Sequence, residues 1–204
     1  AVADFVDSHI AAGRGAKTAF IDPDRSLTFG NLQARSVRFA NGLRALGLRH
    51  EDRAALLLHD TVDYPVAFWG TLRAGSVAIP LNSFLTPAQY AYILTDSRAA
   101  ALVVAAPLAQ AIWPIIGKLT HLKTIVLVGA IDDDRASFPG REVHLFEDLI
   151  AAADPAPFTA ETLSDEVAFW LYTSGSTGDP KGVKHVHSSL MATAKLMGQG
   201  ILGI

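Results

Sequence analysis

Hydrophobic residues between positions 27 and 48 recur at the spacing of an α-helix, in the segment "LTFGNLQARSVRFANGLRALGL". The positions that share one helical face are Leu32, Phe39, Leu43 and Leu46. Thr28 comes just before the pattern and belongs to a residue type that caps helix N-termini. Gly47 follows the pattern, and Leu48 can supply the apolar contact that accompanies a glycine stop. The pattern predicts one amphipathic helix between Thr28 and Gly47.

Short, continuous apolar runs alternate with helical segments along the middle of the chain. Such runs are typical of strands that are buried on both faces of a parallel sheet. They occupy residues 53–59, 76–81, 100–104, 123–129 and 166–172. Regular alternation of strand and helix implies right-handed crossovers between neighbouring strands. The sequence therefore predicts an α/β fold with a mostly parallel sheet flanked by helices.

Proline, glycine and capping residues mark the helices between these strands. Residues 63–74 carry Pro65 in their first turn and end before Gly75. Further helices are expected near residues 107–119 and over residues 188–197. A capping box is predicted from the group Thr86, Pro87 and Gln89. The aromatic residues expected in the core or at an interface are Trp69, Tyr90 and Tyr92.

Two segments lack periodicity and are rich in Asp, Pro, Ala and Gly. They cover residues 129–142 and 151–166, and we interpret both as linkers. The second one suggests a boundary, so that residues 1–160 form a first α/β unit and residues 161–204 begin another.

Composition narrows the class of protein. The 204 residues carry a formal net charge of −3, and only 18% of them are charged. That balance, with no dense Lys/Arg run, argues against a nucleic-acid partner. The chain has no cysteine, which excludes disulfides and thiolate metal sites within it. Its apolar runs are too short to span a bilayer, and we expect a cytoplasmic location. Because Ala1 stands where a start Met would, a trimmed N-terminus is expected.

The segment "WLYTSGSTGDPKGVKHVH", residues 170–187, is the strongest functional candidate. Glycine lets backbone N–H groups turn toward an anion, hydroxyls donate at short reach, and lysine adds a flexible positive charge. The candidate phosphate-binding residues are Thr173, Ser174, Gly175, Ser176, Thr177, Gly178 and Lys181. A Walker A loop would place Gly before the lysine and a helix after it, whereas Pro180 precedes Lys181 and residues 182–187 alternate like a strand. The alternative interpretation is an exposed Ser/Gly hairpin turn.

Other candidates have plainer explanations. His185 and His187 would share one strand face, but no third metal ligand is identifiable, and packing or support near the nucleotide is favoured. Residues 132–134, "DDD", fit a solvated surface loop better than a metal site. "GQGILG", residues 198–203, matches a dinucleotide pattern but follows a predicted helix instead of a strand, so we treat it as coincidence. No metal ligands are assigned.

The motif "YTSGSTGDPKGV" resembles the phosphate-loop signature of the adenylate-forming superfamily, which includes acyl- and aryl-CoA synthetases, nonribosomal adenylation domains and luciferases. "LTFGNL" and "LRAGSVAIPLN" resemble two weaker family blocks in the same order. Within the superfamily, "FWLYTSGSTGDPKGVKHVH" is most similar to benzoate-CoA ligase and related aryl-CoA ligases, and residues 63–94 support this placement. The resemblance extends over essentially the whole chain.

The resemblance also implies what the chain lacks. Family members are more than twice as long, and no "YG-x-TE" block, ribose-binding aspartate, hinge or C-terminal lid with its catalytic lysine is present. The chain thus resembles the N-terminal part of the large domain, with residues 1–160 as its first subdomain and residues 161–204 as the start of the second. We expect the chain alone to be inactive.

The activity implied by the resemblance is ATP-dependent activation of a carboxylic acid, benzoate or a related aryl acid, followed by thioester formation with CoA. ATP, Mg²⁺ and CoA are the implied cofactor and co-substrates, and Lys181 would stabilise the departing phosphates. A homodimer stays open. The alternatives are an amino-acid-adenylating domain and a non-catalytic phosphate-binding α/β module.

Overall fold

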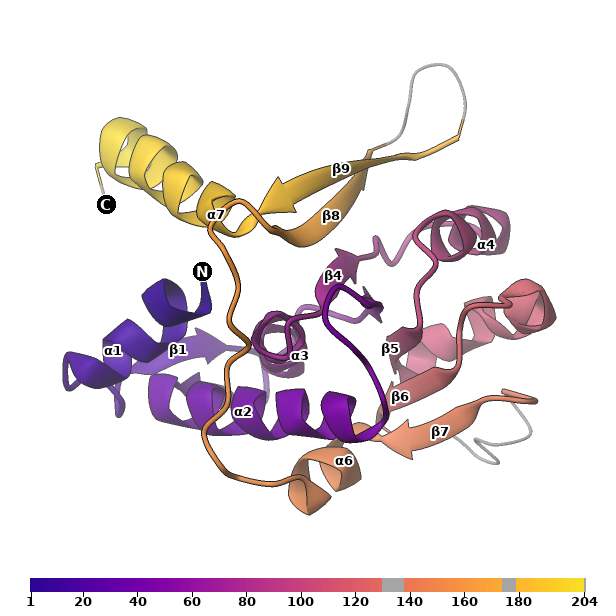
Figure 1. Ribbon diagram of the computed structural model, residues 1–204, viewed down its shortest axis with the longest axis horizontal. Coiled ribbons are helices and arrows are strands. Elements are labelled where there is room, and N and C mark those ends of the chain that lie inside the picture. Colours follow the sequence, from indigo (N-terminus) through magenta and orange to yellow (C-terminus); the bar gives the residue numbers. More distant parts are fainter. Residues whose placement is uncertain (130–137, 174–178, 204) are drawn as a thin grey trace.

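A β-sheet with helices on both of its faces organises the molecule (Figure 1). The structure is a computed structural model that describes residues 1–129, 138–173 and 179–203. Within these residues the strands of the large sheet are β3 Arg53–Leu57, β4 Val77–Pro80, β5 Ala101–Ala105, β6 Thr124–Val128, β7 Glu142–Leu145, β8 Val167–Thr173 and β9 Lys181–Val186. Their order is β7-β6-β5-β3-β4-β8-β9, and each neighbouring pair is parallel except β8 with β9. The predicted α/β fold class is confirmed.

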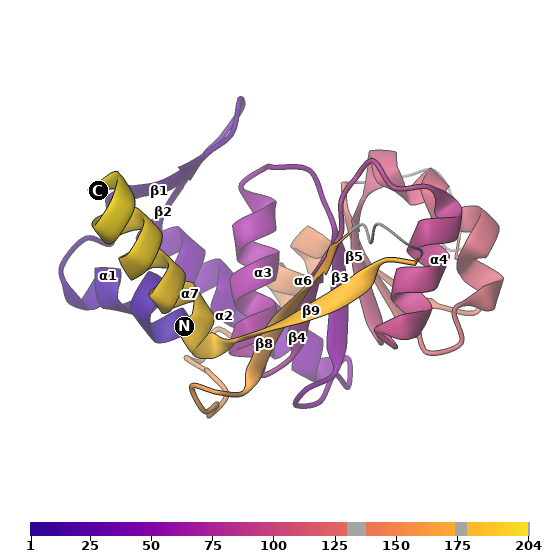
Figure 2. The same ribbon diagram turned by 90° about the horizontal axis from the view of Figure 1, so that it is seen from above.

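Two hydrophobic clusters lie on opposite faces of this sheet, because successive strand residues point to opposite sides. In β3, Ala54 and Leu56 belong to the cluster on the side of α2, α3 and α6, whereas Ala55 and Leu57 belong to the cluster on the side of α4 (Figure 2). These helices are α2 Phe29–Ala45, α3 Asp63–Arg73, α4 Pro87–Asp96 and α6 Phe146–Ala152. All four β3 side chains are fully buried, which explains the continuous apolar run.

The predicted helix caps and the glycine stop are present in the structure. The Thr28 hydroxyl accepts a hydrogen bond from the Asn31 N–H at 3.2 Å, which caps α2. Gly47 ends the helix with φ +86°, a conformation that favours glycine. Thr86 and Gln89 form the predicted capping box at the start of α4.

The helix predicted near residues 107–119 is present as two short 3₁₀ helices instead of one continuous helix. Two 3₁₀ segments occupy this region, η2 Ala106–Ala111 and η3 Trp113–Lys118. Pro114 lacks the N–H that an α-helix running through residue 110 would need, and its ring would collide with the preceding turn. The tighter, interrupted segments avoid both conflicts.

Several elements were not predicted. They are the π-helical turn η1 Ala3–Asp7, the helix α1 Ser8–Ala11, the antiparallel pair β1 Thr18–Ile21 and β2 Ser26–Thr28, the strand β7 and the helix α6. All are short, and β7 is only partly buried, so their sequences carry little periodicity. β7 begins at Glu142, the last residue of the first predicted linker.

The second predicted linker, residues 151–166, is irregular only after α6 ends at Ala152, and its irregular part is attached to α2. Arg38 donates to the Ala153 carbonyl at 3.0 Å, and Asn41 donates to the Asp154 carbonyl at 2.8 Å. The Arg44 guanidinium lies 3.7 Å from the centroid of the Phe158 ring. This segment therefore crosses α2 as a fixed strap (Figure 1). The domain boundary at residue 160 stays a prediction, and β8 joins the sheet beside β4 through the pair Ala78 and Phe169.

The chain continues from β9 into α7 His187–Thr193 and the π-helical η4 Ala194–Leu202, which together project from the sheet (Figure 1). The "GQGILG" segment falls largely in η4 and follows helix, so the dinucleotide reading has no strand to support it. Within the described part of the chain, no helix combines the length and apolar character needed to cross a bilayer. Trp69 and Tyr90 are buried as expected, whereas Tyr92 is 36% exposed.

A candidate phosphate-binding hairpin

The candidate loop connects strands β8 and β9 and therefore lies at the turn end of this antiparallel hairpin, called the hairpin mouth below (Figure 1). The ladder runs from Val167 opposite Val186 to Thr173 opposite Lys181, which is its last pair. The predicted alternating strand after Lys181 is thus confirmed. The register brings Thr173 and Lys181 together across the mouth of the loop, and both side chains are exposed.

Five of the predicted phosphate-binding residues lie outside the described residues: Ser174, Gly175, Ser176, Thr177 and Gly178. Residues 132–134 also lie outside them. The structure therefore places the two ends of the candidate loop, Thr173 and Lys181, and their assignment as phosphate ligands stays a prediction. Lys181 forms no ion pair with the residues that are described.

The hairpin mouth lies at the carboxyl edge of the parallel strands, where α/β sheets place their ligands. β8 runs parallel to β4, so the turn after β4 emerges at the same edge as Thr173. In that turn the Asn82 side chain accepts from the Phe84 N–H at 2.9 Å, and the Tyr90 hydroxyl donates to the Asn82 carbonyl at 2.8 Å. The block "LRAGSVAIPLN" therefore builds a fixed turn at this edge.

Helix α4 contacts the hairpin close to its mouth. The Tyr172 hydroxyl donates to the Asp96 carboxylate at 2.6 Å. Burial, followed by the bond to Asp96, raises the pKa of Tyr172 above its ordinary value. The Tyr172 ring also lies across Gly182, where an added Cβ would be 3.1 Å from the Tyr172 Cζ atom. Asp96 was not found from the sequence, because it is separated from Tyr172 by 76 positions and belongs to no motif.

The expectation that His185 and His187 share a strand face is wrong. His185 is in β9, with its ring stacked on Phe169 at a centroid distance of 4.6 Å. His187 begins α7 and is buried, and burial is the main cause that lowers its pKa. The chain turns from strand to helix between the two, so their side chains have different surroundings. Packing, the favoured interpretation, describes both.

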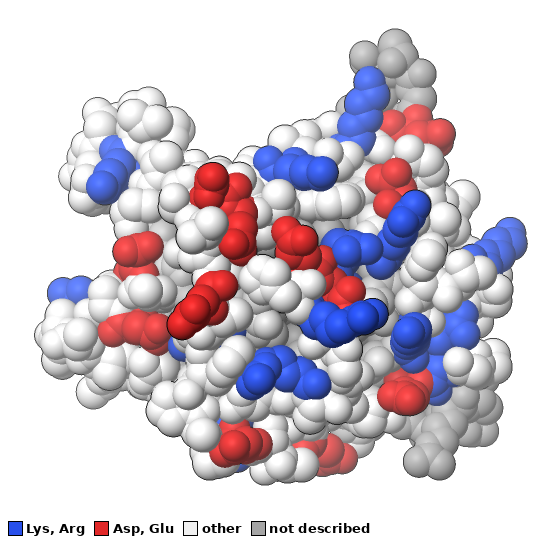
Figure 3. Space-filling view, viewed as in Figure 1, with Lys and Arg blue, Asp and Glu red and all other residues white. Residues whose placement is uncertain are grey.

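No group of three or more potential metal-ligating His, Asp or Glu side chains exists among the described residues. Figure 3 shows both basic (blue) and acidic (red) side chains at the hairpin end of the molecule. Lys181 and Asp179 are both exposed. The exposed Lys181 ammonium has no ion-pair partner among the residues that the structure describes, so it is available to an anionic ligand.

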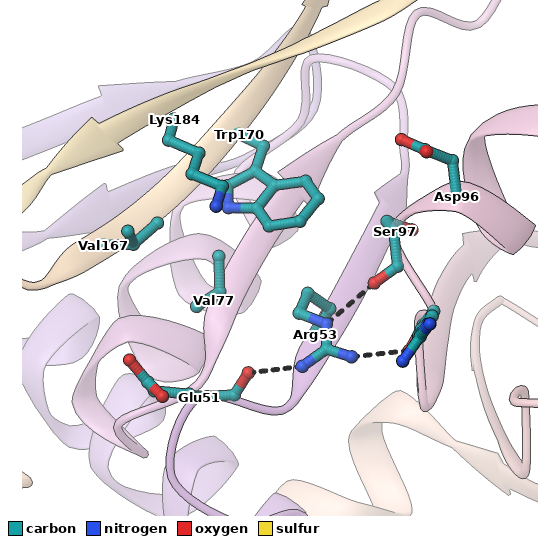
Figure 4. A pocket seen from close by; sticks show the side chains of 9 residues that line it. Glu51, Arg53, Val77, Asp96, Ser97, Val167, Trp170 and Lys184 are labelled. Carbon is teal, nitrogen blue, oxygen red and sulfur yellow. Dashed lines mark hydrogen bonds between the residues drawn. The ribbon is translucent and has the colours of Figure 1, made fainter.

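A cavity of about 430 Å³ lies under the hairpin, on the side of the loops that precede β3 and β5, and Asp96 is among the residues that line it (Figure 4). Trp170 and Lys184 line one side of it, and Ser97 lines the other. Arg53 in this cavity donates to the carbonyls of Ser97 at 2.7 Å and Glu51 at 2.9 Å. Its guanidinium therefore joins the loops at the start of β3 and β5, which is a structural role.

The comparisons with known proteins agree with this geometry. Residues 8–202 match the family of AMP-binding enzymes. The 4-hydroxybenzoate–CoA/benzoate–CoA ligase of Rhodopseudomonas palustris is 43% identical over 98% of this chain, and the benzoate–CoA ligase of Thauera aromatica is 38% identical over 98%. The chain spans 36% of the length of each.

Solved structures show the same likeness. The anthranilate CoA ligase AuaEII, determined with anthranoyl-AMP, superposes with a TM-score of 0.91 at 31% identity, over 100% of this chain and 38% of that one. A benzoate CoA ligase from Burkholderia xenovorans LB400 gives a TM-score of 0.83 at 39% identity, over 100% and 37%. The family expectation drawn from the loop motif is confirmed, and the chain belongs to the AMP-binding enzyme family.

Proposed function

We propose that this chain is the ATP-phosphate-binding part of an AMP-forming acid–CoA ligase that acts on benzoate or a related aryl acid. The observation that carries the proposal is the pairing of Thr173 with Lys181 at the carboxyl edge of the sheet. The motif between them and the family match over residues 8–202 support the same assignment. The aryl preference rests on the relatives, whose names include benzoate and hydroxybenzoate ligases.

The proposed chemistry has two half-reactions. A carboxylate is a poor electrophile because its leaving group would be oxide. In the first step a carboxylate oxygen attacks the α-phosphorus of ATP, which forms the acyl-adenylate and breaks the bond to pyrophosphate. In the second step the CoA thiol, losing its proton, attacks the acyl carbon and AMP leaves. The protein's contribution to such displacements is mainly positioning and charge stabilisation.

The residues of this chain would act on the outgoing phosphates. Thr173, Ser174, Ser176 and Thr177 would donate from their hydroxyls, and Gly175 and Gly178 would open the backbone to the ligand. Lys181 would place its ammonium where negative charge grows as pyrophosphate departs. Mg²⁺ would shield the phosphates, but no acidic cluster among the described residues could hold it.

We propose that the whole activity belongs to a protein longer than these 204 residues. The chain spans 36% of its curated relatives, so we expect it to catalyse neither half-reaction by itself. A cytoplasmic location and a homodimer stay predictions.

The first experiment replaces Lys181 in the full-length ligase. Lys181→Ala should slow acid-dependent ATP–pyrophosphate exchange. The loss of one charge-stabilising donor should remove about 2–4 kcal/mol of transition-state stabilisation. Lys184→Ala is the matched control, since Lys184 lies on the same strand but beside the Trp170 ring, with Nζ 5.3 Å from its centroid. Unchanged exchange in Lys181→Ala would reject the proposed role.

A second experiment tests the acid. Hydroxylamine traps the acyl-adenylate, so hydroxamate formation can be measured with benzoate, hydroxybenzoates, fatty acids and amino acids. We expect the aryl acids to give the highest kcat/KM. Preference for a fatty acid would overturn the aryl assignment, and preference for an amino acid would favour an amino-acid-adenylating enzyme.

A further inference from the structure

We infer that Asp96 is a positioning residue for Thr173 and Lys181, the two described ends of the phosphate loop, and acts through its hydrogen bond to Tyr172. The inference rests on the proposed function, because it assumes that the loop after Thr173 binds the phosphates of ATP. It assigns a role to helix α4, which contributes no residue to the loop motif.

Tyr172 occupies a central place at the hairpin mouth. It immediately precedes Thr173, and its cross-strand partner Gly182 immediately follows Lys181. The Tyr172 ring lies over Gly182 so closely that an added Cβ would be 3.1 Å from Cζ and 3.3 Å from the hydroxyl oxygen. The ring therefore contacts both strands next to the pair that opens the loop.

The backbone of Asp96, which accepts the Tyr172 hydrogen bond through its side chain, is anchored to the core. Asp96 is the last residue of α4, whose residues Ile93 and Leu94 are buried in the core. Ser97, directly after it, is also buried, and its carbonyl accepts from the Arg53 guanidinium at 2.7 Å. A short bond from a phenol to a carboxylate on such a support fixes the phenol oxygen relative to the sheet.

The hydrogen bond is better suited to positioning than to stability. Asp96 is exposed and Tyr172 is only partly buried, so both groups can turn to water when the bond is lost. Misplacement of the hairpin mouth would instead shift Thr173 and Lys181 together, and small errors in such geometry reduce rates strongly. The bond should therefore matter for the phosphate-transfer step more than for folding.

The test uses the full-length ligase and separates the two half-reactions. Tyr172→Phe and Asp96→Ala should each lower kcat/KM for ATP in acid-dependent pyrophosphate exchange about tenfold. The double variant should be no worse than either single variant, since both remove the same bond. Thioester formation from synthetic benzoyl-adenylate and CoA should be unchanged, because no pyrophosphate is present in that step.

Two control variants accompany the test. Asp96→Asn keeps an oxygen acceptor and should stay within about threefold of the parent enzyme. Tyr64→Phe removes the same hydroxyl group from α3, where no side-chain hydrogen bond joins it to the described residues, and should leave the kinetics unchanged.

Each other outcome overturns the inference. If Tyr172→Phe and Asp96→Ala keep parental kinetics while Lys181→Ala is impaired, the positioning role is rejected and the proposed function stands. If the variants slow both half-reactions equally and lower the melting temperature, the bond is merely structural. If Lys181→Ala is itself unimpaired, the proposed function fails, and the positioning role fails with it.

Discussion

The parallel strands β3 to β6 and the hairpin β8–β9 belong to one sheet but differ in burial. Every residue of β5 is buried, and four of the five residues of β3 are. In β8 only Ala168 and Phe169 are buried, and the first four residues of β9 are exposed. The first region is covered by helices on both faces, whereas the end of the hairpin projects past α4 (Figure 1).

This difference separates stability from chemistry. Residues buried on both faces contribute mainly apolar surface removed from water. An exposed hairpin contributes less to the core, but its end is accessible to a ligand. We therefore expect substitutions in the parallel strands to act mainly on folding and substitutions in the hairpin to act mainly on adenylation.

The largest effect is expected from truncating a core leucine. Leu56→Ala, at a site with no exposed surface, should lower the free energy of unfolding by about 2–5 kcal/mol, because it loses apolar contacts and leaves a cavity. Leu171→Ala is the matched change in the hairpin, where the side chain is 40% exposed, and should cost about 1 kcal/mol or less. Urea denaturation of both variants measures the difference. Equal losses of unfolding free energy in the two variants would contradict the expected difference between the two regions.

An intermediate effect is expected from filling two glycine contacts. At Gly70, between α2 and α3, an added Cβ would lie 2.7 Å from a ring carbon of Phe39 and 3.1 Å from the Ser36 carbonyl oxygen. Gly70→Ala should therefore destabilise the protein by about 1–3 kcal/mol through overpacking.

In the hairpin, Gly182→Ala would press on the Tyr172 ring, which is only partly buried and can move. We expect a small stability change and a loss of pyrophosphate exchange of about tenfold in the full-length ligase. The paired measurements are urea denaturation and exchange kinetics. If Gly182→Ala kept the parental exchange rate but strongly lowered the free energy of unfolding, the hairpin would act on stability as the core does, and the expected difference would be contradicted.

The smallest effects concern pH, and two buried groups that flank these regions, His187 after the hairpin and Asp22 beside the start of α3, should respond in different pH ranges. Burial, followed by the positive N-terminus, lowers the pKa of His187 below 6.5, so the unfolded chain binds more protons. This contribution is complete above pH 6.5 and is lost as pH falls toward the folded pKa. For Asp22, the bond from the Val62 N–H at the start of α3 is the main cause that lowers its pKa below 3.8. The stability from Asp22 is present above pH 3.8 and is lost as pH falls through the lower folded pKa.

Unfolding free energy measured from pH 8 to pH 3 tests both contributions. His187→Gln should flatten the decline just below pH 6.5, and Asp22→Asn should flatten the decline below pH 3.8. Identical pH profiles for parent and variant would contradict the corresponding assignment.

Local sequence patterns predicted most of the fold, because burial and helix capping leave regular spacings of residue types. The β3, β5 and β6 runs are apolar because both of their faces are buried, and Thr28 and Thr86 cap helices through contacts three residues away. The partly buried β7 and the helix α6 lack such a signal. The pattern after β5 predicted one helix but not its division into two 3₁₀ segments, which depends on Pro114.

The sequence by itself determined the chemistry that this chain offers, namely hydroxyls, glycines and a lysine spaced over nine residues, because short-range spacing suffices to build a loop. Only the tertiary structure decided that Thr173 faces Lys181 at the carboxyl edge of the sheet and that Asp96 holds the neighbouring tyrosine. Such contacts depend on strand order and helix packing, which join residues far apart in the chain and leave no mark in a local pattern.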